Sequence, residues 1–251
     1  MENSAIIIPV RMGSTRFPGK PLARILGRPM LEWVVRHSIE AIGQDRTIVA
    51  TCDAEIVDLA ENLGVKSVLT STAHERATDR TAEAVSILEG EGFLLERVLM
   101  LQGDEPTIKP DALRVVLDSL EQQPAFSIVN LVGPIESDEE WRDPNCIKVV
   151  SSTSHEAVYL SRLPIPHGGE IGKTQILKQV CAIGFRRSAL REFANLTPTA
   201  LEISESIDML RWIENGRSIY LKEISARTHP VDHPHDIRVV EEILKSSGSE
   251  I

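Results

Sequence analysis

The run Ala5-Ile6-Ile7-Ile8-Pro9 is continuously apolar, and one residue later comes Arg11-Met12-Gly13-Ser14-Thr15-Arg16-Phe17-Pro18-Gly19-Lys20-Pro21. An unbroken apolar run is typical of a strand buried on both faces of a parallel sheet. The loop after it holds three cations and two hydroxyls, at the strand end where open parallel sheets bind ligands. Its spacing is neither GxxxxGK[ST] nor GxGxxG.

The composition of this loop indicates phosphate binding. Arg11 and Arg16 can each bind phosphate oxygens with two N–H groups, and Lys20 can place a point charge on a leaving pyrophosphate. Gly13 lets the backbone approach a ligand, and the Ser14 hydroxyl lies beside it. The structural alternative is a solvated basic turn. We expect that alternative to be the weaker one in a chain of net charge −10.

Short apolar runs alternate with helical patterns along the chain. Asp53 precedes one of these patterns and is predicted to cap the helix that follows it. The rhythm predicts an α/β fold, a mostly parallel twisted sheet with helices on both faces, formed as one domain over residues 1–251. The expected strands are 47–51, 66–69, 97–102, 126–132 and 218–224, and the expected helices are 29–42, 54–63, 78–88, 110–120, 201–214 and 234–244.

The rhythm changes between residues 146 and 185. Residues 147–150 and 157–160 are typical of a hairpin, 163–173 are rich in turns, and 179–185 are typical of a strand. We therefore expect an inserted antiparallel arm of about 146–185. Such an insertion can cover a site or build an oligomer contact.

Charge and composition exclude several classes of protein. The chain of 251 residues has 27 basic and 37 acidic side chains, which does not suit general nucleic-acid or anionic-membrane binding. No apolar run approaches the ~20 residues of a membrane span. Its three cysteines, Cys52, Cys146 and Cys181, are far apart in sequence and favour a reducing compartment. We expect a soluble cytoplasmic protein.

Two further segments carry acidic residues at predicted strand or helix ends. Gln102-Gly103-Asp104-Glu105-Pro106 follows an apolar strand, and carboxylates there can hold Mg²⁺ beside phosphates. Glu105 is either part of that site or a plain turn residue. In 228–234, Asp232 is either a second metal carboxylate or a helix cap, and His229 and His233 are expected to be local hydrogen-bonding groups rather than metal ligands.

Together these segments resemble the CMP-Kdo synthetases, the 3-deoxy-manno-octulosonate (Kdo) cytidylyltransferases, which are sugar nucleotidyltransferases of lipopolysaccharide biosynthesis. Residues 6–22 resemble the family's signature loop almost residue for residue, and LQGDEPTI from Leu101 resembles its QGDEP motif. The similarity continues through GRPMLEWV from Gly27, DPNCIKVV from Asp143, SRLPIP from Ser161 and VDHPHDI from Val231. It covers nearly the whole chain in the same order.

The resemblance implies a transferase that joins CTP to a sugar acid and releases pyrophosphate, with Mg²⁺ as cofactor. The residues it implies for CTP are Arg11, Ser14, Arg16, Lys20, Arg80 and Gln102, the last reading cytosine. Arg16, Lys20, Asp104 and Asp232 would be catalytic, the two carboxylates holding the metal. Arg162 and Glu205 would face the sugar, and the chain would form a homodimer partly through the arm.

The departures from the family pattern fall on the sugar side. Gln179, Ile183, Ile203 and Met209 replace a histidine, a tyrosine, a histidine and a glutamine, and His167 replaces a tryptophan. Losing hydrogen-bonding groups changes which acceptor is accepted. Replacement bonds from His167, Gln179 or Arg186 are one way in which Kdo would still fit. Otherwise, we expect an acceptor whose distal end differs from Kdo, such as an 8-amino-Kdo, a sialic-acid-like sugar or a phosphonate.

Two rival functions are weaker. A catalytically silent nucleotide-binding regulator would be marked by loss of Arg16, Lys20, Asp104 or Asp232, and all four are present. An NAD-dependent dehydrogenase would need a GxGxxG sequence after a strand, and none occurs.

Overall fold

The computed structural model describes residues 3–14 and 16–247. Its central feature is a sheet in the order β11-β7-β10-β6-β1-β4-β5, with a hairpin, β8 and β9, attached to β10. The strands are β1 (Ser4–Pro9), β2 (Arg24–Ile25), β3 (Arg28–Pro29), β4 (Thr47–Thr51), β5 (Lys66–Leu69), β6 (Arg97–Leu101), β7 (Ile128–Pro134), β8 (Lys148–Ser151), β9 (Ala157–Ser161), β10 (Leu177–Arg186) and β11 (Tyr220–Glu223).

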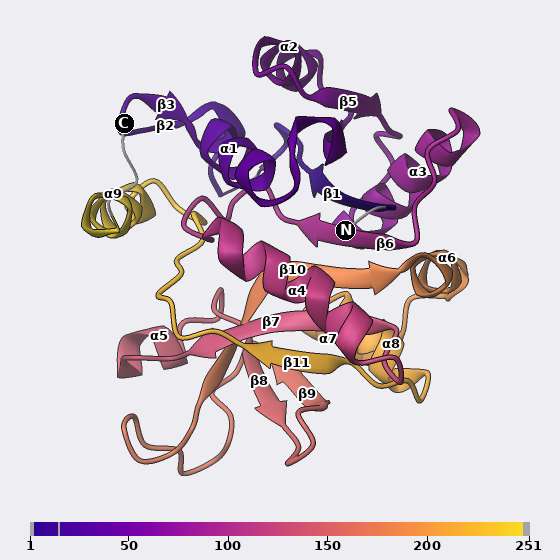
Figure 1. The fold of residues 1–251 in the computed structure, drawn as a ribbon. Helices are drawn as coiled ribbons and strands as arrows, with labels where there is room; N and C mark the ends of the chain where they lie inside the picture. The colour runs from indigo at the N-terminus through magenta and orange to yellow at the C-terminus, as the bar shows by residue number, and fades with distance from the viewer. Residues whose placement is uncertain (1–2, 15, 248–251) are drawn as a thin grey trace.

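Helices cover both faces of this sheet (Figure 1). The helices are α1 (Met30–Ile42), α2 (Ala54–Asn62), α3 (Ala77–Gly90), α4 (Pro110–Gln122), α5 (Asp138–Arg142), α6 (Arg187–Asn195), α7 (Ala200–Glu205), α8 (Met209–Glu214) and α9 (Asp236–Ser246), with 3₁₀ turns η1 (Lys20–Leu22) and η2 (Gln44–Arg46). The α/β fold predicted from the alternating pattern is confirmed. None of the helices in the part of the chain that the structure describes is long and apolar enough to cross a lipid bilayer.

Strand β1 shows why both faces are covered. Its side chains point alternately to opposite faces, and all six of its residues are buried. Ile6 and Ile8 pack with α1, α2 and α4, whereas Ala5 and Ile7 pack with α3, α6 and α8. Two apolar cores therefore enclose the sheet, and only its carboxyl-terminal edge is left for polar chemistry.

The parallel strands end at that edge together. Strand β1 pairs in parallel with β4 on one side and β6 on the other, and β4 pairs in parallel with β5. The segments that follow β1 and β6 are the basic loop and the QGDEP segment of the sequence, so the sheet brings them side by side. Strand β11 is parallel to β7, and the chain beyond it leads to Asp232.

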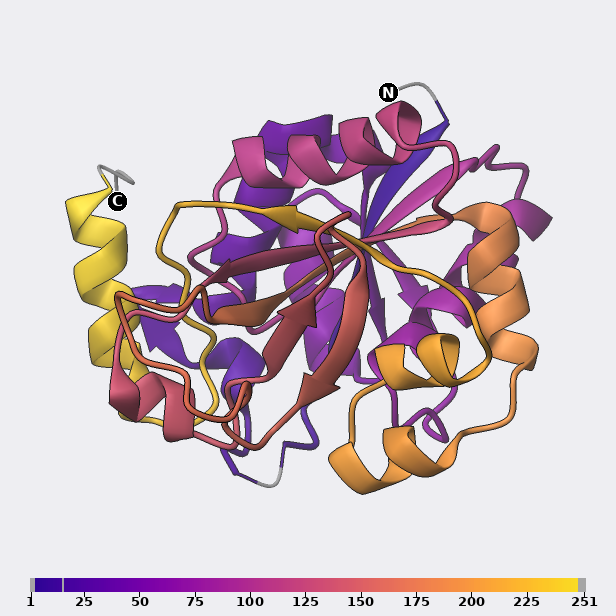
Figure 2. The same ribbon diagram turned by 90° about the horizontal axis from the view of Figure 1, so that it is seen from below.

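Strand β10 corrects our prediction for residues 179–185. We assigned this strand to the inserted arm, but it lies in the central sheet between β6 and β7 and is antiparallel to both. An apolar run does not reveal which sheet a strand joins, because a buried strand has the same composition in an inserted arm and in the central sheet. The hairpin of β8 and β9 pairs only with the first residues of β10, Leu177 and Lys178. Figure 2 shows this hairpin projecting from the sheet.

Two other predictions need correction. Residues 201–214 form two short helices rather than one, because Ser206 takes a left-handed conformation with φ 55° between α7 and α8. Arg162 stabilises that break by donating to the backbone carbonyls of Glu205 at 2.6 Å and Ser206 at 3.2 Å. Asp53 occupies the N-cap position of α2, but its side chain does not cap the helix.

The packing of α4 on β10 depends on Gly184. A Cβ atom there would lie 2.6 Å from Cγ1 of Val116 and 3.0 Å from Cδ1 of Leu120, both fully buried. We predict that Gly184→Ala lowers the free energy of unfolding by about 1–3 kcal/mol, because the buried neighbours cannot move away freely. Urea denaturation measures this change.

Gly133→Ala is the matched control. The nearest atom to a Cβ at Gly133 is Cγ2 of Val180 at 3.7 Å, an ordinary contact. We expect this variant to stay within about 0.5 kcal/mol of the parent or to gain slightly, because alanine restricts the unfolded chain. Equal stability of the two variants would show that α4 does not press on β10.

Candidate active site

A cavity of about 740 Å³ opens at the carboxyl-terminal edge of the sheet. Every predicted site residue lines it except Glu205. Those that do are Arg11, Ser14, Arg16, Lys20, Arg80, Gln102, Asp104, Arg162, Gln179 and Asp232. Arg11 and Asp232, 221 positions apart in sequence, therefore line one cavity, as expected if the polar segments that follow the strands meet at one edge of the sheet.

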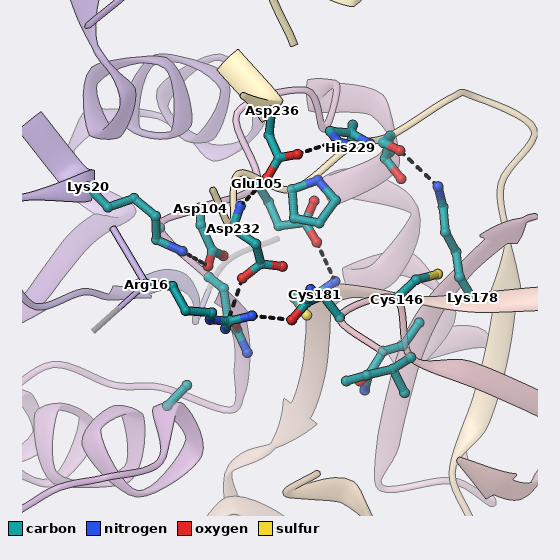
Figure 3. A pocket seen from close by; sticks show the side chains of 18 of the residues that line it. Arg16, Lys20, Asp104, Glu105, Cys146, Lys178, Cys181, His229, Asp232 and Asp236 are labelled. Atoms are coloured by element: carbon teal, nitrogen blue, oxygen red, sulfur yellow. Dashed lines mark hydrogen bonds and ion pairs between the residues drawn. The ribbon is translucent and has the colours of Figure 1, made fainter. Parts of the chain in front are cut away.

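Two ion pairs connect the basic loop to the predicted metal carboxylates (Figure 3). Lys20 Nζ donates to Asp104 Oδ2 at 2.6 Å and to the Val231 carbonyl at 2.8 Å. Arg16 pairs with Asp232 Oδ1 at 2.9 Å and also donates to the side chain of Asn145. The two cations thus neutralise the two carboxylates, which come from β6 and from the segment before α9.

The carboxylates also influence each other. Burial and the negative charge of Asp104 raise the pKa of Asp232, whereas Lys20 and Arg16 oppose that rise. Burial together with the charge of Asp104 raises the pKa of the neighbouring Glu105 to about 8. A positive charge placed between Asp104 and Asp232 would relieve this repulsion.

Glu105 proves to be more than a plain turn residue. Its side chain lines the cavity and is almost fully buried. One carboxyl oxygen accepts the N–H of Cys181 at 3.0 Å, at the point where the pairing of β10 with β7 shifts. Its other oxygen has no hydrogen-bond partner among the described residues. Glu105 therefore holds the irregular part of β10 against the QGDEP segment.

Asp236 holds the backbone around Asp232. Its Oδ2 accepts the N–H groups of Asp232 at 2.8 Å and His233 at 2.7 Å. Burial alone would raise the pKa of Asp236, but these backbone bonds outweigh it and the pKa lies below its usual value. His229 contacts Asp236 at 3.4 Å, so its prediction as a local hydrogen-bonding group is confirmed. Among the described residues, no three His, Cys, Asp or Glu side chains gather as a metal cluster.

Several side chains predicted to bind the nucleotide already make hydrogen bonds within the protein. Arg80 is buried and donates to Thr70 Oγ1 at 2.5 Å and to the His74 carbonyl at 3.4 Å. Arg11 reaches the same carbonyl at 3.4 Å, and the Ser14 hydroxyl accepts the Phe17 N–H at 3.3 Å. The Gln102 side chain lines the cavity without a hydrogen bond to any described residue.

The predicted sugar side differs more from expectation. The structure places Glu205 outside the cavity wall, where its carboxylate accepts from Tyr159, Ser161 and the Arg162 N–H. Among the replaced positions, Ile203 is 65% exposed and also lies outside the wall, as does His167.

Ile183, Met209 and Gln179 do line the cavity, and Gln179 donates to Asn130 Oδ1 at 2.6 Å. Sequence reasoning missed Lys178, which lines the wall and binds Glu140 and the Thr228 carbonyl. Its position beside Gln179 in an otherwise apolar strand was the available signal.

Comparison with known proteins agrees with this arrangement. The model of the cytidylyltransferase family matches residues 5–224. The chain is 35% identical, over 95% of its length and 97% of the relative's, to the 3-deoxy-manno-octulosonate cytidylyltransferase of Syntrophotalea carbinolica. The chain belongs to the 3-deoxy-manno-octulosonate cytidylyltransferase family.

Other members of that family give the same result. The Escherichia coli 3-deoxy-manno-octulosonate cytidylyltransferase is 32% identical and aligns with 100% of this chain and 99% of its own. A solved structure of CMP:2-keto-3-deoxy-manno-octonic acid synthetase in complex with CTP superposes with a TM-score of 0.86 at 33% identity. It covers 97% of this chain and 99% of that one. The chain is thus a nucleotidyltransferase of the cytidylyltransferase type.

Proposed function

We propose that the protein transfers CMP from CTP to a 3-deoxy-octulosonate-type sugar acid and releases pyrophosphate. The observation that carries the proposal is that a loop with three cations faces two carboxylates across one cavity. One carboxylate follows β6 and the other precedes α9, and the Lys20–Asp104 and Arg16–Asp232 pairs join them to the loop. The names of its relatives supply the substrates, Kdo and CTP.

The triphosphate would lie along the basic loop. Arg11 and Arg16 are the exposed cations of the loop, and Lys20 is the more buried one beside Asp104. On binding, triphosphate oxygens would compete with the carboxylates for Arg16 and Lys20, which then stabilise charge on the leaving pyrophosphate. Gln102, with its side-chain amide unpaired among the described residues, is suited to reading the edge of cytosine.

Asp104 and Asp232 fit Mg²⁺. They offer hard oxygen donors, burial and the negative charge of Asp104 raise the pKa of Asp232, and a protein site for Mg²⁺ needs only one or two carboxylates beside substrate phosphates. When bound, Mg²⁺ lowers the pKa of a hydroxyl nucleophile and neutralises phosphate charge. Asp236 would keep the backbone of Asp232 in place while the Asp232 side chain binds the metal.

The reaction itself follows from these positions. The anomeric hydroxyl oxygen of the acceptor forms a bond to the α-phosphorus of CTP while the bond to the pyrophosphate oxygen breaks. The hydroxyl proton passes to solvent, and pyrophosphate leaves toward Lys20 and Arg16. Glu105 is not the base, because its side chain is almost fully buried and one carboxyl oxygen already accepts the Cys181 N–H.

An acceptor that differs from Kdo at its distal end is the second candidate, and one observation favours it. Ile183 and Met209 are apolar parts of the wall, whereas the acidic part near α5 is Glu139, which has no ion pair with a described residue. Its neighbours Glu136 and Glu140 pair with Arg227 and Lys178. Carboxylates bind an ammonium group better than a hydroxyl. An amino-bearing sugar acid such as 8-amino-Kdo would use this acidic part.

We expect pyrophosphate release with CTP and Mg²⁺ in the presence of a 3-deoxy sugar acid. The assay compares CTP with UTP and ATP, and it measures kcat/KM for Kdo beside its 8-amino analogue and sialic acid. Each lost hydrogen bond weakens binding about ten- to a hundredfold, so Kdo should be used less well than the amino analogue.

Contrary outcomes separate the two parts of this proposal. UTP or ATP working as well as CTP would remove the role of Gln102 in reading the base. Kdo preferred over every other acceptor would remove the second candidate and leave the first. No pyrophosphate release with any acceptor would contradict both.

We predict that Asp104→Asn and Asp232→Asn each lower kcat at least ~10²-fold, because a lost metal carboxylate removes charge stabilisation in the transition state. Steady-state kinetics across a Mg²⁺ titration measure this loss. Asp118→Asn, at an exposed carboxylate of α4 that does not line the cavity, is the control and should retain CTP turnover. Near parental rates for both Asn variants at saturating Mg²⁺ would refute the metal assignment.

We also propose a cytoplasmic homodimer formed partly through the hairpin of β8 and β9. The hairpin exposes two apolar side chains, Val158 of β9 at 54% and Leu163 just after β9 at 69%. Sedimentation should show twice the chain mass at micromolar concentration, and Val158→Glu should shift it toward a single chain, because a buried charge disfavours the interface. A parent that sediments as one chain would contradict the dimer.

A further inference from the structure

Helix α2 begins without the side-chain cap that its sequence provides. Asp53 lies at the N-cap position with extended backbone angles, φ −114° and ψ 127°, and aspartate is among the best capping residues. Its carbonyl accepts the N–H groups of Ile56 and Val57, both at 3.2 Å, but its carboxylate makes no capping bond. The helix therefore lacks an interaction that it could have made, and the carboxylate is used elsewhere.

The carboxylate instead binds the loop after β1. Oδ2 of Asp53 accepts the N–H of Met12 at 2.7 Å, across 41 positions of sequence. The contact is possible because β4, which ends two residues before Asp53, pairs directly with β1. Thr51 Oγ1 accepts the Asp53 N–H at 3.2 Å and so helps to fix the backbone of Asp53.

Met12 is the junction of the basic loop. Its carbonyl accepts the N–H of Ser14 at 2.8 Å and that of Gly19 at 3.5 Å, so both halves of the loop return to this one residue. Its side chain packs against the core formed by α1, α2 and α4. The backbone of Met12 is thus held by Asp53 on one side and holds the loop on the other.

Asp53 acts here as a hydrogen-bond acceptor, because the positive charges of Arg16 and Lys20 are already paired with Asp232 and Asp104. Asp53 does not line the cavity, so a ligand cannot compete for it.

We propose that Asp53 is the positioning residue that holds the loop 11–20 ready for the triphosphate, a proposal that rests on the proposed CTP-dependent function. It acts through Met12 and touches no substrate. We assign this role because the Asp53 carboxylate binds the Met12 N–H instead of capping α2.

Asp53→Ser and Asp53→Asn test the proposal as a pair. A serine oxygen can cap α2 but is one atom too short to replace the bond to Met12, whereas asparagine keeps an acceptor at the same reach. For Asp53→Ser we expect a denaturation midpoint within about 3 °C of the parent. We expect hydrogen exchange at the Met12, Ser14 and Gly19 amides to become about tenfold or more faster in the ligand-free protein.

Kinetics give the second measurement. Asp53→Ser should raise KM for CTP about tenfold, while KM for the acceptor at saturating CTP changes less than about twofold, because only the triphosphate loop is loosened. Asp53→Asn should remain within about twofold of the parent in both exchange and KM.

Each other outcome counts against the role. Parental exchange and parental KM for CTP in Asp53→Ser would overturn it. So would faster exchange throughout the chain with a large fall in midpoint, or an asparagine variant as impaired as the serine one, because these mark a general structural role. If the parent itself does not use CTP, the proposed function fails, and the exchange measurement still decides whether Asp53 anchors the loop.

Discussion

The parallel pairing of β1 with β6 is the constraint on which the site depends. It sets Ile7 opposite Met100, so the basic loop and the QGDEP segment leave the sheet at the same level. Gly103 favours this close approach, because a Cβ atom there would lie 3.1 Å from Cβ and Cγ2 of Val10 and would push Val10 away. The close approach of these two segments is what lets Lys20 reach both Asp104 and the Val231 carbonyl.

The sequence predicted best where composition alone determines structure. A run such as Ile6-Ile7-Ile8 excludes solvent on both faces, and polar residues that follow such strands must meet at one edge of the sheet. That reasoning found the fold and the facing of the basic loop with Asp104, and it needed no knowledge of side-chain contacts. The resemblance to the family supplied Arg80, Arg162 and Gln179. Of the eleven predicted site residues, ten line the cavity.

The failures share one cause, which is competition between a local interaction and a distant one. Asp53 has the sequence position of a cap, and nothing nearby reveals that Met12 claims its carboxylate. The break at Ser206 is stabilised by Arg162 from the hairpin, which helical periodicity cannot show. Glu205 matches a motif position, but its carboxylate already accepts hydrogen bonds from Tyr159, Ser161 and the Arg162 N–H. Such choices depend on tertiary packing.

Strand β10 serves two parts of the molecule at once. Its first residues pair with β8 of the hairpin, and its next residues, Gln179, Cys181 and Ile183, form part of the cavity wall. A continuous strand transmits displacement along its backbone, so a shift of the hairpin reaches the wall without any intervening loop. Exchanging the side chains of Gln179, Cys181 or Ile183 can therefore reshape this part of the cavity wall on an unchanged backbone. Insertions or deletions within β10 would disturb the hairpin and the wall together.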